Sequence, residues 1–155
     1  MGFDLYGNNC PELELPLEEL MKMSGEDIQQ YYETLGKNQQ YFRSNIGWWK
    51  FIHWAVLNVG EIRDTKICRS GWMYNNGYKV SKTRSKRIAK KIRERILNEK
   101  YFPLWITTLE EEFRKLGLLE HVPIKKVDES LIKDIREHLE DFATFCDKSE
   151  GFGIY

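Results

Sequence analysis

The segment between residues 41 and 59 is the most apolar part of this chain, and it constrains the fold more than any other feature. Its apolar side chains recur at helical spacing in one stripe: Trp49, Ile52, Val56 and Val59. Trp48 and Phe51 widen that stripe, so a helix here is apolar on nearly all sides. Such a helix usually lies at the centre of a core. We therefore expect a central helix that ends at Gly60.

Four further segments show helical patterns, at residues 24–36, 81–98, 103–117 and 128–146. Three of them start at a residue that caps helices well: Ser24, Ser81 and Asp128. Glycine, asparagine and proline interrupt residues 1–16, which we expect to be irregular. The sequence thus predicts a mainly α protein, a single compact domain over residues 1–155 with about five helices and at most a minor β element. Within residues 61–80 a short strand and an extended loop fit equally.

The composition excludes several classes of protein. A chain of 155 residues with 41% hydrophobic residues can bury a core of its own, so it is not intrinsically disordered. No stretch approaches the roughly 18 apolar residues of a membrane span, and the N-terminal residues lack the basic and apolar regions of a secretion signal. Cys10, Cys68 and Cys146 are odd in number and far apart, which fits reduced thiols. We expect a cytoplasmic protein with no membrane partner.

The net charge of zero hides a strongly uneven distribution of charge. Residues 79–95 hold nine basic residues and one acidic residue, whereas residues 1–33 hold eight acidic residues and one basic residue. Residues 128–150 are acidic again. Two interpretations remain open: the acidic and basic elements balance each other inside the fold, or the basic segment faces an anionic ligand.

No catalytic or metal-binding motif is present. His53, His121 and His138 are widely separated and lie in no HExxH or CxxC context, and the chain has no GxSxG, P-loop or GxGxxG sequence. We expect His53 to lie in or near the core and His138 on a helix surface. The interpretation is a binding protein without catalytic residues, metal or cofactor, although a catalytic set assembled from distant residues stays open.

The aromatic and arginine-containing block at residues 41–49 is the first candidate binding segment. Aromatic faces stack on nucleobases, and Arg43 can pair with a phosphate. Trp48 and Trp49 point about 100° apart on a helix, so one is expected in the core while the other lines a pocket. The alternative is that both are core residues. Asn45 would read polar edges of the ligand.

The second candidate segment runs from the Asn76-Gly77 turn into a helix rich in hydroxyl and basic groups. Free N–H groups at a helix start attract phosphate. Lys82 and Arg84 oppose the helix dipole unless an anion is present, and Lys86 lies on the outward side. Arg84, Arg87, Lys91 and Arg95 flank the apolar side and can instead reach a neighbouring cleft or an acidic helix.

Several anchors distributed along the chain resemble a group of small bacteriophage and prophage proteins. They are Met1–Gly7, Tyr41–Asn45 with Trp48-Trp49, Asn76-Gly77 before Ile88-Ala89, and Phe142–Cys146 through Gly151-Phe152. The chain differs from that group at Ser44, at Lys50-Phe51 and at Asn75–Gly77. The resemblance implies an origin in a phage, and small phage proteins often disarm host immunity in the host cytoplasm.

Two kinds of phage anti-defence protein are implied by this resemblance. One sequesters a phosphorylated nucleotide signal without cleaving it, as a molecular sponge does, and such sites often form between subunits of a homo-oligomer. The other binds a host defence protein, as anti-CRISPR proteins do, through an acidic surface formed here by Glu12, Glu14, Glu18, Glu19 and Asp27. A third interpretation is direct binding of nucleic acid by the helix at residues 79–95.

The leading hypothesis is the nucleotide sponge. It combines the two candidate segments into one site, in which rings stack on a base and basic side chains neutralise phosphate. The residues expected to bind the ligand are Arg43, Asn45, Trp48, Trp49, Asn76, Lys82, Arg84 and Lys86.

Overall fold

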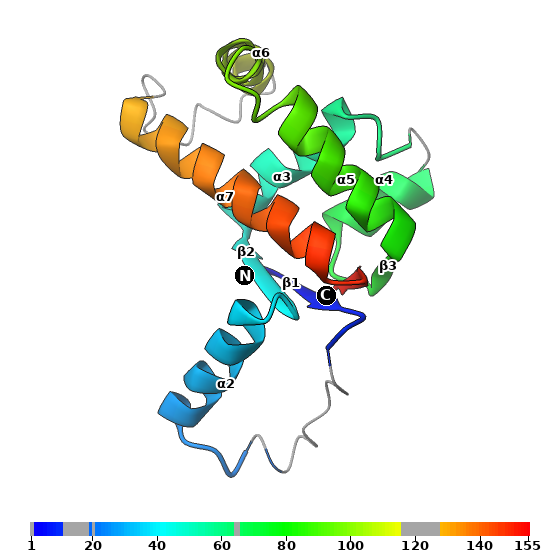
Figure 1. Ribbon diagram of the computed structural model, residues 1–155, viewed down its shortest axis with the longest axis vertical. Helices are drawn as coiled ribbons and strands as arrows, with labels where there is room; N and C mark the ends of the chain where they lie inside the picture. The colour runs from blue at the N-terminus through cyan, green and yellow to red at the C-terminus, as the bar shows by residue number, and fades with distance from the viewer. Residues whose placement is uncertain (1, 11–18, 20, 64–65, 116–127) are drawn as a thin grey trace.

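The computed structural model of the protein describes residues 2–10, 19, 21–63, 66–115 and 128–155 (Figure 1). In chain order the elements are β1 (Gly2–Gly7), α2 (Gly25–Lys37), β2 (Tyr41–Asn45), α3 (Ile46–Asn58), α4 (Lys66–Met73), β3 (Tyr78–Ser81), α5 (Lys82–Arg95), α6 (Phe102–Lys115), α7 (Glu129–Lys148) and β4 (Gly151–Ile154). No helix in the described part of the chain is long and apolar enough to cross a membrane.

The four strands form one antiparallel sheet in the order β2-β1-β4-β3. The two central strands, β1 and β4, come from opposite ends of the chain. On one side, here called the inner face, the sheet packs against α3, α5 and α7. On the other side, the outer face, α2 packs on β2 and projects away from the helical layer (Figure 1).

This sheet shows that the predicted mainly α fold was wrong, because the protein is a mixed α/β structure. Residues 2–7, expected to be irregular, are a central strand, and residues 41–45, for which no strand was expected, are an edge strand. Each strand has only four to six residues. Such short segments carry little periodic signal in the sequence. The pairing of strands from opposite ends of the chain cannot be recognised in a local window of the sequence.

The expected central helix is confirmed as α3, which begins at Ile46 and is capped by Asn45. Its predicted apolar stripe is buried against the sheet and α7. From the strands, Phe3, Leu5 and Phe152 point into the same core. Ser24, Ser81 and Asp128 each cap the helix that follows by accepting a backbone N–H bond, as their positions predicted.

Candidate functional site

Trp49, one of the predicted stacking residues, lies in the core. Its side chain is 2% exposed, and its ring stacks on Phe3 with centroids 4.5 Å apart. The indole N–H donates to the backbone carbonyl of Trp72 at 2.7 Å. Trp48 is half-buried, and its ring lies 5.2 Å from the ring of His138. Trp49 therefore offers no open ring face to a ligand.

Three basic side chains of α5, those of Arg84, Arg87 and Lys91, converge on Glu61 in the turn after α3. Glu61 is 3% exposed. Its two carboxylate oxygens accept from Arg87 at 2.6 and 2.9 Å, and one also accepts from Lys91 at 2.6 Å. Arg84 donates to the Glu61 carbonyl and, at 2.8 Å, to the hydroxyl of Tyr78. Burial raises the pKa of Glu61, but the Arg87 and Lys91 hydrogen bonds outweigh that effect and hold the pKa below its ordinary value.

Lys82, another predicted phosphate ligand, pairs with Glu150. Arg93, which was not among the predicted ligands, pairs with Glu140 at 2.8 Å. Acidic residues of the same chain thus pair with several cations of α5, as the first of the two interpretations of the charge distribution expected. Lys86 and Asn76 are exposed. Asn45 caps α3, because its side-chain oxygen accepts the Trp48 N–H at 3.0 Å.

The two predicted binding segments lie at opposite edges of the sheet. Arg43 belongs to edge strand β2, whereas Lys82, Arg84 and Lys86 follow edge strand β3. The structure therefore does not bring the predicted ligand-binding residues together in one site. Of that set, only Arg43 lines a described groove.

The outer face carries a different aromatic cluster. Strand pairing places Tyr41, Tyr6, Gly153 and Lys79 opposite one another in a row across the four strands. The neighbouring row begins with Arg43 opposite Asp4, and Asp4 in turn exchanges both backbone hydrogen bonds with Tyr155. We call Asp4, Tyr6, Tyr32, Tyr41, Arg43 and Tyr155 the outer-face cluster.

The tyrosine rings of this cluster are in continuous contact. Tyr32 of α2 packs on Tyr41 with centroids 4.9 Å apart, Tyr41 packs on Tyr6 at 5.1 Å, and Tyr6 meets Tyr155 edge-on at 5.7 Å. Burial is the main cause that raises the pKa of Tyr6 and of Tyr41 far above the ordinary value. The two rings therefore stay neutral phenols and remain hydrogen-bond donors at physiological pH.

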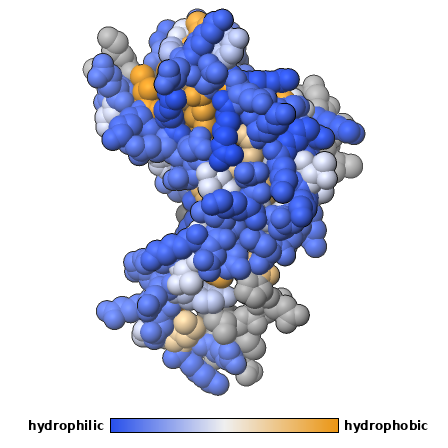
Figure 2. Space-filling model, viewed as in Figure 1, coloured by the Kyte–Doolittle hydropathy of each residue, from blue (hydrophilic) through white to orange (hydrophobic). Residues whose placement is uncertain are grey.

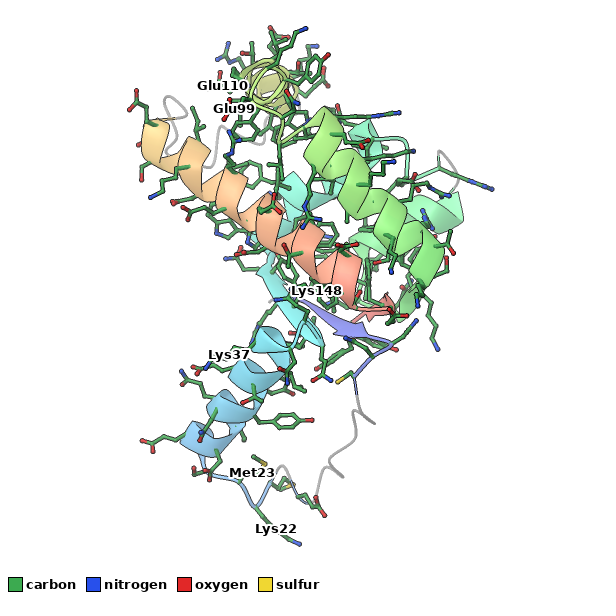
Figure 3. All side chains as sticks on the ribbon, viewed as in Figure 1. Lys22, Met23, Lys37, Glu99, Glu110 and Lys148 are labelled. Carbon is green, nitrogen blue, oxygen red and sulfur yellow. The ribbon has the colours of Figure 1, made fainter. Side chains whose placement is uncertain are left out.

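A groove of about 520 Å³ lies between α2 and β2, beside this cluster. Its lining residues are Gly25, Ile28, Gln29, Tyr32, Glu33, Tyr41 and Arg43. The α2 wall of the groove belongs to the helix that projects between Met23 and Lys37 in Figure 3. The Tyr41 hydroxyl donates to the Asp4 carboxylate, and Asp4 also lies 3.7 Å from Arg43. The Arg43 side chain remains 67% exposed, so most of its donors are open to a ligand.

A buried serine and a partly buried histidine join β2 to α7. The Oγ atom of Ser44 lies 3.1 Å from Nε2 of His138. Ser44 is 1% exposed, so no substrate can reach its hydroxyl in this structure. His138, expected on a helix surface, instead packs between Phe42 and Trp48. The pair therefore links the sheet to the helical layer and does not form a nucleophile with its base.

Mild acid is expected to destabilise the protein through His138. Burial lowers the pKa of its ring from the ordinary 6.5 to about 4, so the folded state holds the neutral ring. The stability that comes from the neutral ring is fully present above about pH 6.5. It is lost as the pH falls towards 4, because the unfolded chain binds the proton more readily than the folded chain does. Because the ring is only partly enclosed, we expect a loss of about 2 kcal/mol.

Urea unfolding at a series of pH values measures that slope. His138→Phe, which fills a similar volume without a titrating group, should flatten the curve between pH 4 and pH 6.5 relative to the original chain. An NMR titration that finds the ring protonating near its ordinary pKa would contradict the proposed burial effect.

Sequence reasoning missed Asp4, Tyr6, Tyr32 and Tyr155 as candidate binding residues. The available signal was the alternation of apolar Phe3 and Leu5 with Asp4 and Tyr6, which is typical of a strand with one buried face. In the structure Phe3 and Leu5 are buried and Tyr6 faces the other side of the sheet. Of the predicted acidic surface, Glu12, Glu14 and Glu18 lie outside the described residues, as does His121. Glu19 is exposed, and Asp27 belongs to the capping box of α2.

Comparison with known proteins adds no relative. No protein-family model, curated protein or solved structure matches this chain. Within residues 2–10, 19, 21–63, 66–115 and 128–155, no group of three or more histidine, cysteine or acidic side chains is arranged to hold a metal ion.

Proposed function

We propose that this protein is a phage anti-defence protein that sequesters a phosphorylated nucleotide signal in the groove between α2 and β2, without cleaving it. The observation that carries the proposal is the groove itself, which combines the rings of Tyr32 and Tyr41 with the exposed guanidinium of Arg43. The phage origin rests on the resemblance of the sequence anchors, and it places the protein in the cytoplasm of the infected host.

The groove chemistry suits the base and the phosphate of a nucleotide. Neutral tyrosine rings stack on a base regardless of its identity. The Arg43 guanidinium forms charge-assisted hydrogen bonds to phosphate oxygens. Gln29 and Glu33 of α2 line the same groove, where the Gln29 amide donates to the Glu33 carboxylate at 3.0 Å. The Gln29 amide can both donate and accept at the polar edge of a base, whereas Glu33 only accepts. A volume of about 520 Å³ lies within the range of small-molecule sites.

The surface around α2 favours a polar ligand. In Figure 2 the projecting region of α2 is largely hydrophilic, with few strongly hydrophobic residues on the face that is seen. Two carboxylates oppose an anion here. Glu33 lines the groove and accepts the Gln29 amide at 3.0 Å, and the Asp4 carboxylate accepts the Tyr41 hydroxyl and lies beside Arg43. Asp4 therefore orients the ring and the guanidinium, and the solvent-facing donors of Arg43 remain for phosphate.

Calorimetry with a panel of cyclic dinucleotides and cyclic ADP-ribose isomers tests this proposal. We expect at least one member to bind and to be recovered intact after denaturation. Arg43→Ala should weaken that binding about 10- to 100-fold, the effect of losing a hydrogen bond to a charged group. Lys86→Ala, which removes an exposed cation of α5, is the matched control and should leave the affinity unchanged.

Two results would contradict the proposed function. One is the absence of heat with every member of the panel. The other is an Arg43→Ala variant that binds as well as the original chain while melting at the same temperature. A stoichiometric host protein captured by the immobilised chain, and still captured by Arg43→Ala, would favour a protein-binding inhibitor in place of a nucleotide sponge.

A further inference from the structure

The outer face of the sheet continues beyond the groove as far as β3. Beside Tyr6, the ring of Tyr155 lies across the β4 backbone and is 46% exposed. Lys79 of β3 is exposed, and it stands directly opposite Gly153 of β4. The face thus presents a ring beyond the groove and a second cation at the far edge.

Two glycines provide the space in which the Tyr155 ring lies flat. A Cβ atom on Gly153 would come within 2.6 Å of the Tyr155 ring, and one on Gly77 within 3.3 Å. Gly77 also has a φ of +75°, which other residues rarely adopt. Because one side of the ring is against backbone, the exposed part of Tyr155 faces outward and can stack on a planar group.

We propose that the bound nucleotide contains two bases, and that the second base stacks on Tyr155 while its phosphate pairs with Lys79. This inference rests on the proposed function, in which Tyr32, Tyr41 and Arg43 hold the first base and phosphate. The rings form a continuous series from α2 to β4, with a cation at each edge of the sheet. Three strand spacings, about 14 Å, separate β2 from β3.

A two-base nucleotide fits this face better than a long single strand does. Among the described strand residues, Arg43 and Lys79 are the cations on the outer face, and Asp4 lies opposite Arg43. The chain as a whole has no net charge. Long polyanions require a cationic track that neutralises many phosphates, whereas two phosphates require only the two cations that the sheet edges provide.

Calorimetry with two defined probes, AMP and the linear dinucleotide pApA, tests the inference. Stacking of one more base contributes about 1–3 kcal/mol, so pApA should bind about 5- to 150-fold more tightly than AMP. Tyr155→Ala should remove most of that advantage and leave the affinity for AMP unchanged, whereas Tyr155→Phe should retain it. Lys79→Ala should reduce the advantage as well, and Lys86→Ala should not.

Several outcomes would overturn the inference. Equal affinity for AMP and pApA would show that only one base is held, while leaving the proposed function intact. Equal weakening of both probes by Tyr155→Ala would show that the ring only supports the sheet. Tighter binding of a longer single-stranded oligonucleotide, with affinity that falls steeply with salt, would point to nucleic acid instead. If neither probe nor any member of the signal panel binds, the proposed function fails as well.

Discussion

Replacing Glu61 with glutamine is expected to lower the free energy of unfolding by about 1–3 kcal/mol, less than the full cost of breaking a buried ion pair because the Arg87 side chain is half exposed and solvent screens it. The amide keeps the size of the side chain but cannot neutralise Arg87 and Lys91, which lie 2.6 Å from the carboxylate. For a chain of this size, the melting temperature should fall by about 2–12 °C. Thermal melts followed by circular dichroism, together with urea unfolding, measure both quantities.

The pH dependence separates this charge effect from simple repacking. The folded-state pKa of Glu61 is lowered, so its contribution is present above the unfolded pKa and is lost as the pH falls through the folded pKa. The difference in stability between the original chain and Glu61→Gln should therefore be largest near neutral pH and shrink in strong acid.

Glu140→Gln is the matched control, because it removes an exposed carboxylate that pairs with Arg93 of the same helix. We expect a loss below about 1 kcal/mol for this variant. If Glu61→Gln costs no more than this control, the cations of α5 are solvated and available, and the basic helix becomes a candidate phosphate site again.

The sequence predicted the helices well where their signals are local. A cap such as Ser24 or Asp128 acts on backbone N–H groups three residues away, so its effect is visible in a short window. For the sheet, the short alternation of apolar residues in residues 2–7 was a much weaker local signal. Residues 2–7 gain their strand character by pairing with residues 41–45 and 152–154, and that pairing depends on tertiary contacts far apart in the chain.

Around the candidate groove, the sequence singled out Arg43 and the aromatic block of β2 but missed most of the neighbouring rings. Tyr41 belongs to that block, whereas Tyr6 and Tyr32 come from β1 and α2, and Tyr155 directly follows β4. The partner of the basic helix was missed for a related reason. Glu61 is a single acidic residue in a turn, and only the folded chain shows that it lies under Arg87 and Lys91.

Trp49→Ala is expected to cost about 3–5 kcal/mol of folding free energy, as large aromatic deletions in a core do. The variant loses the stack on Phe3, leaves a cavity, and leaves the Trp72 carbonyl without its 2.7 Å hydrogen bond. Trp48→Ala, the adjacent substitution of the same residue type, should cost much less because that ring is only half-buried. Urea unfolding of the two variants side by side measures the difference.

The two variants should also differ in their effect on His138. Trp48 packs directly on the histidine ring, with centroids 5.2 Å apart, so its removal admits water and should raise the His138 pKa from about 4 towards the ordinary 6.5. Trp49→Phe, which keeps an aromatic ring in the core, should leave the His138 pKa unchanged. Equal destabilisation by Trp48→Ala and Trp49→Ala would contradict the assignment of Trp49 to the core, and it would reopen that indole as a stacking surface for a ligand.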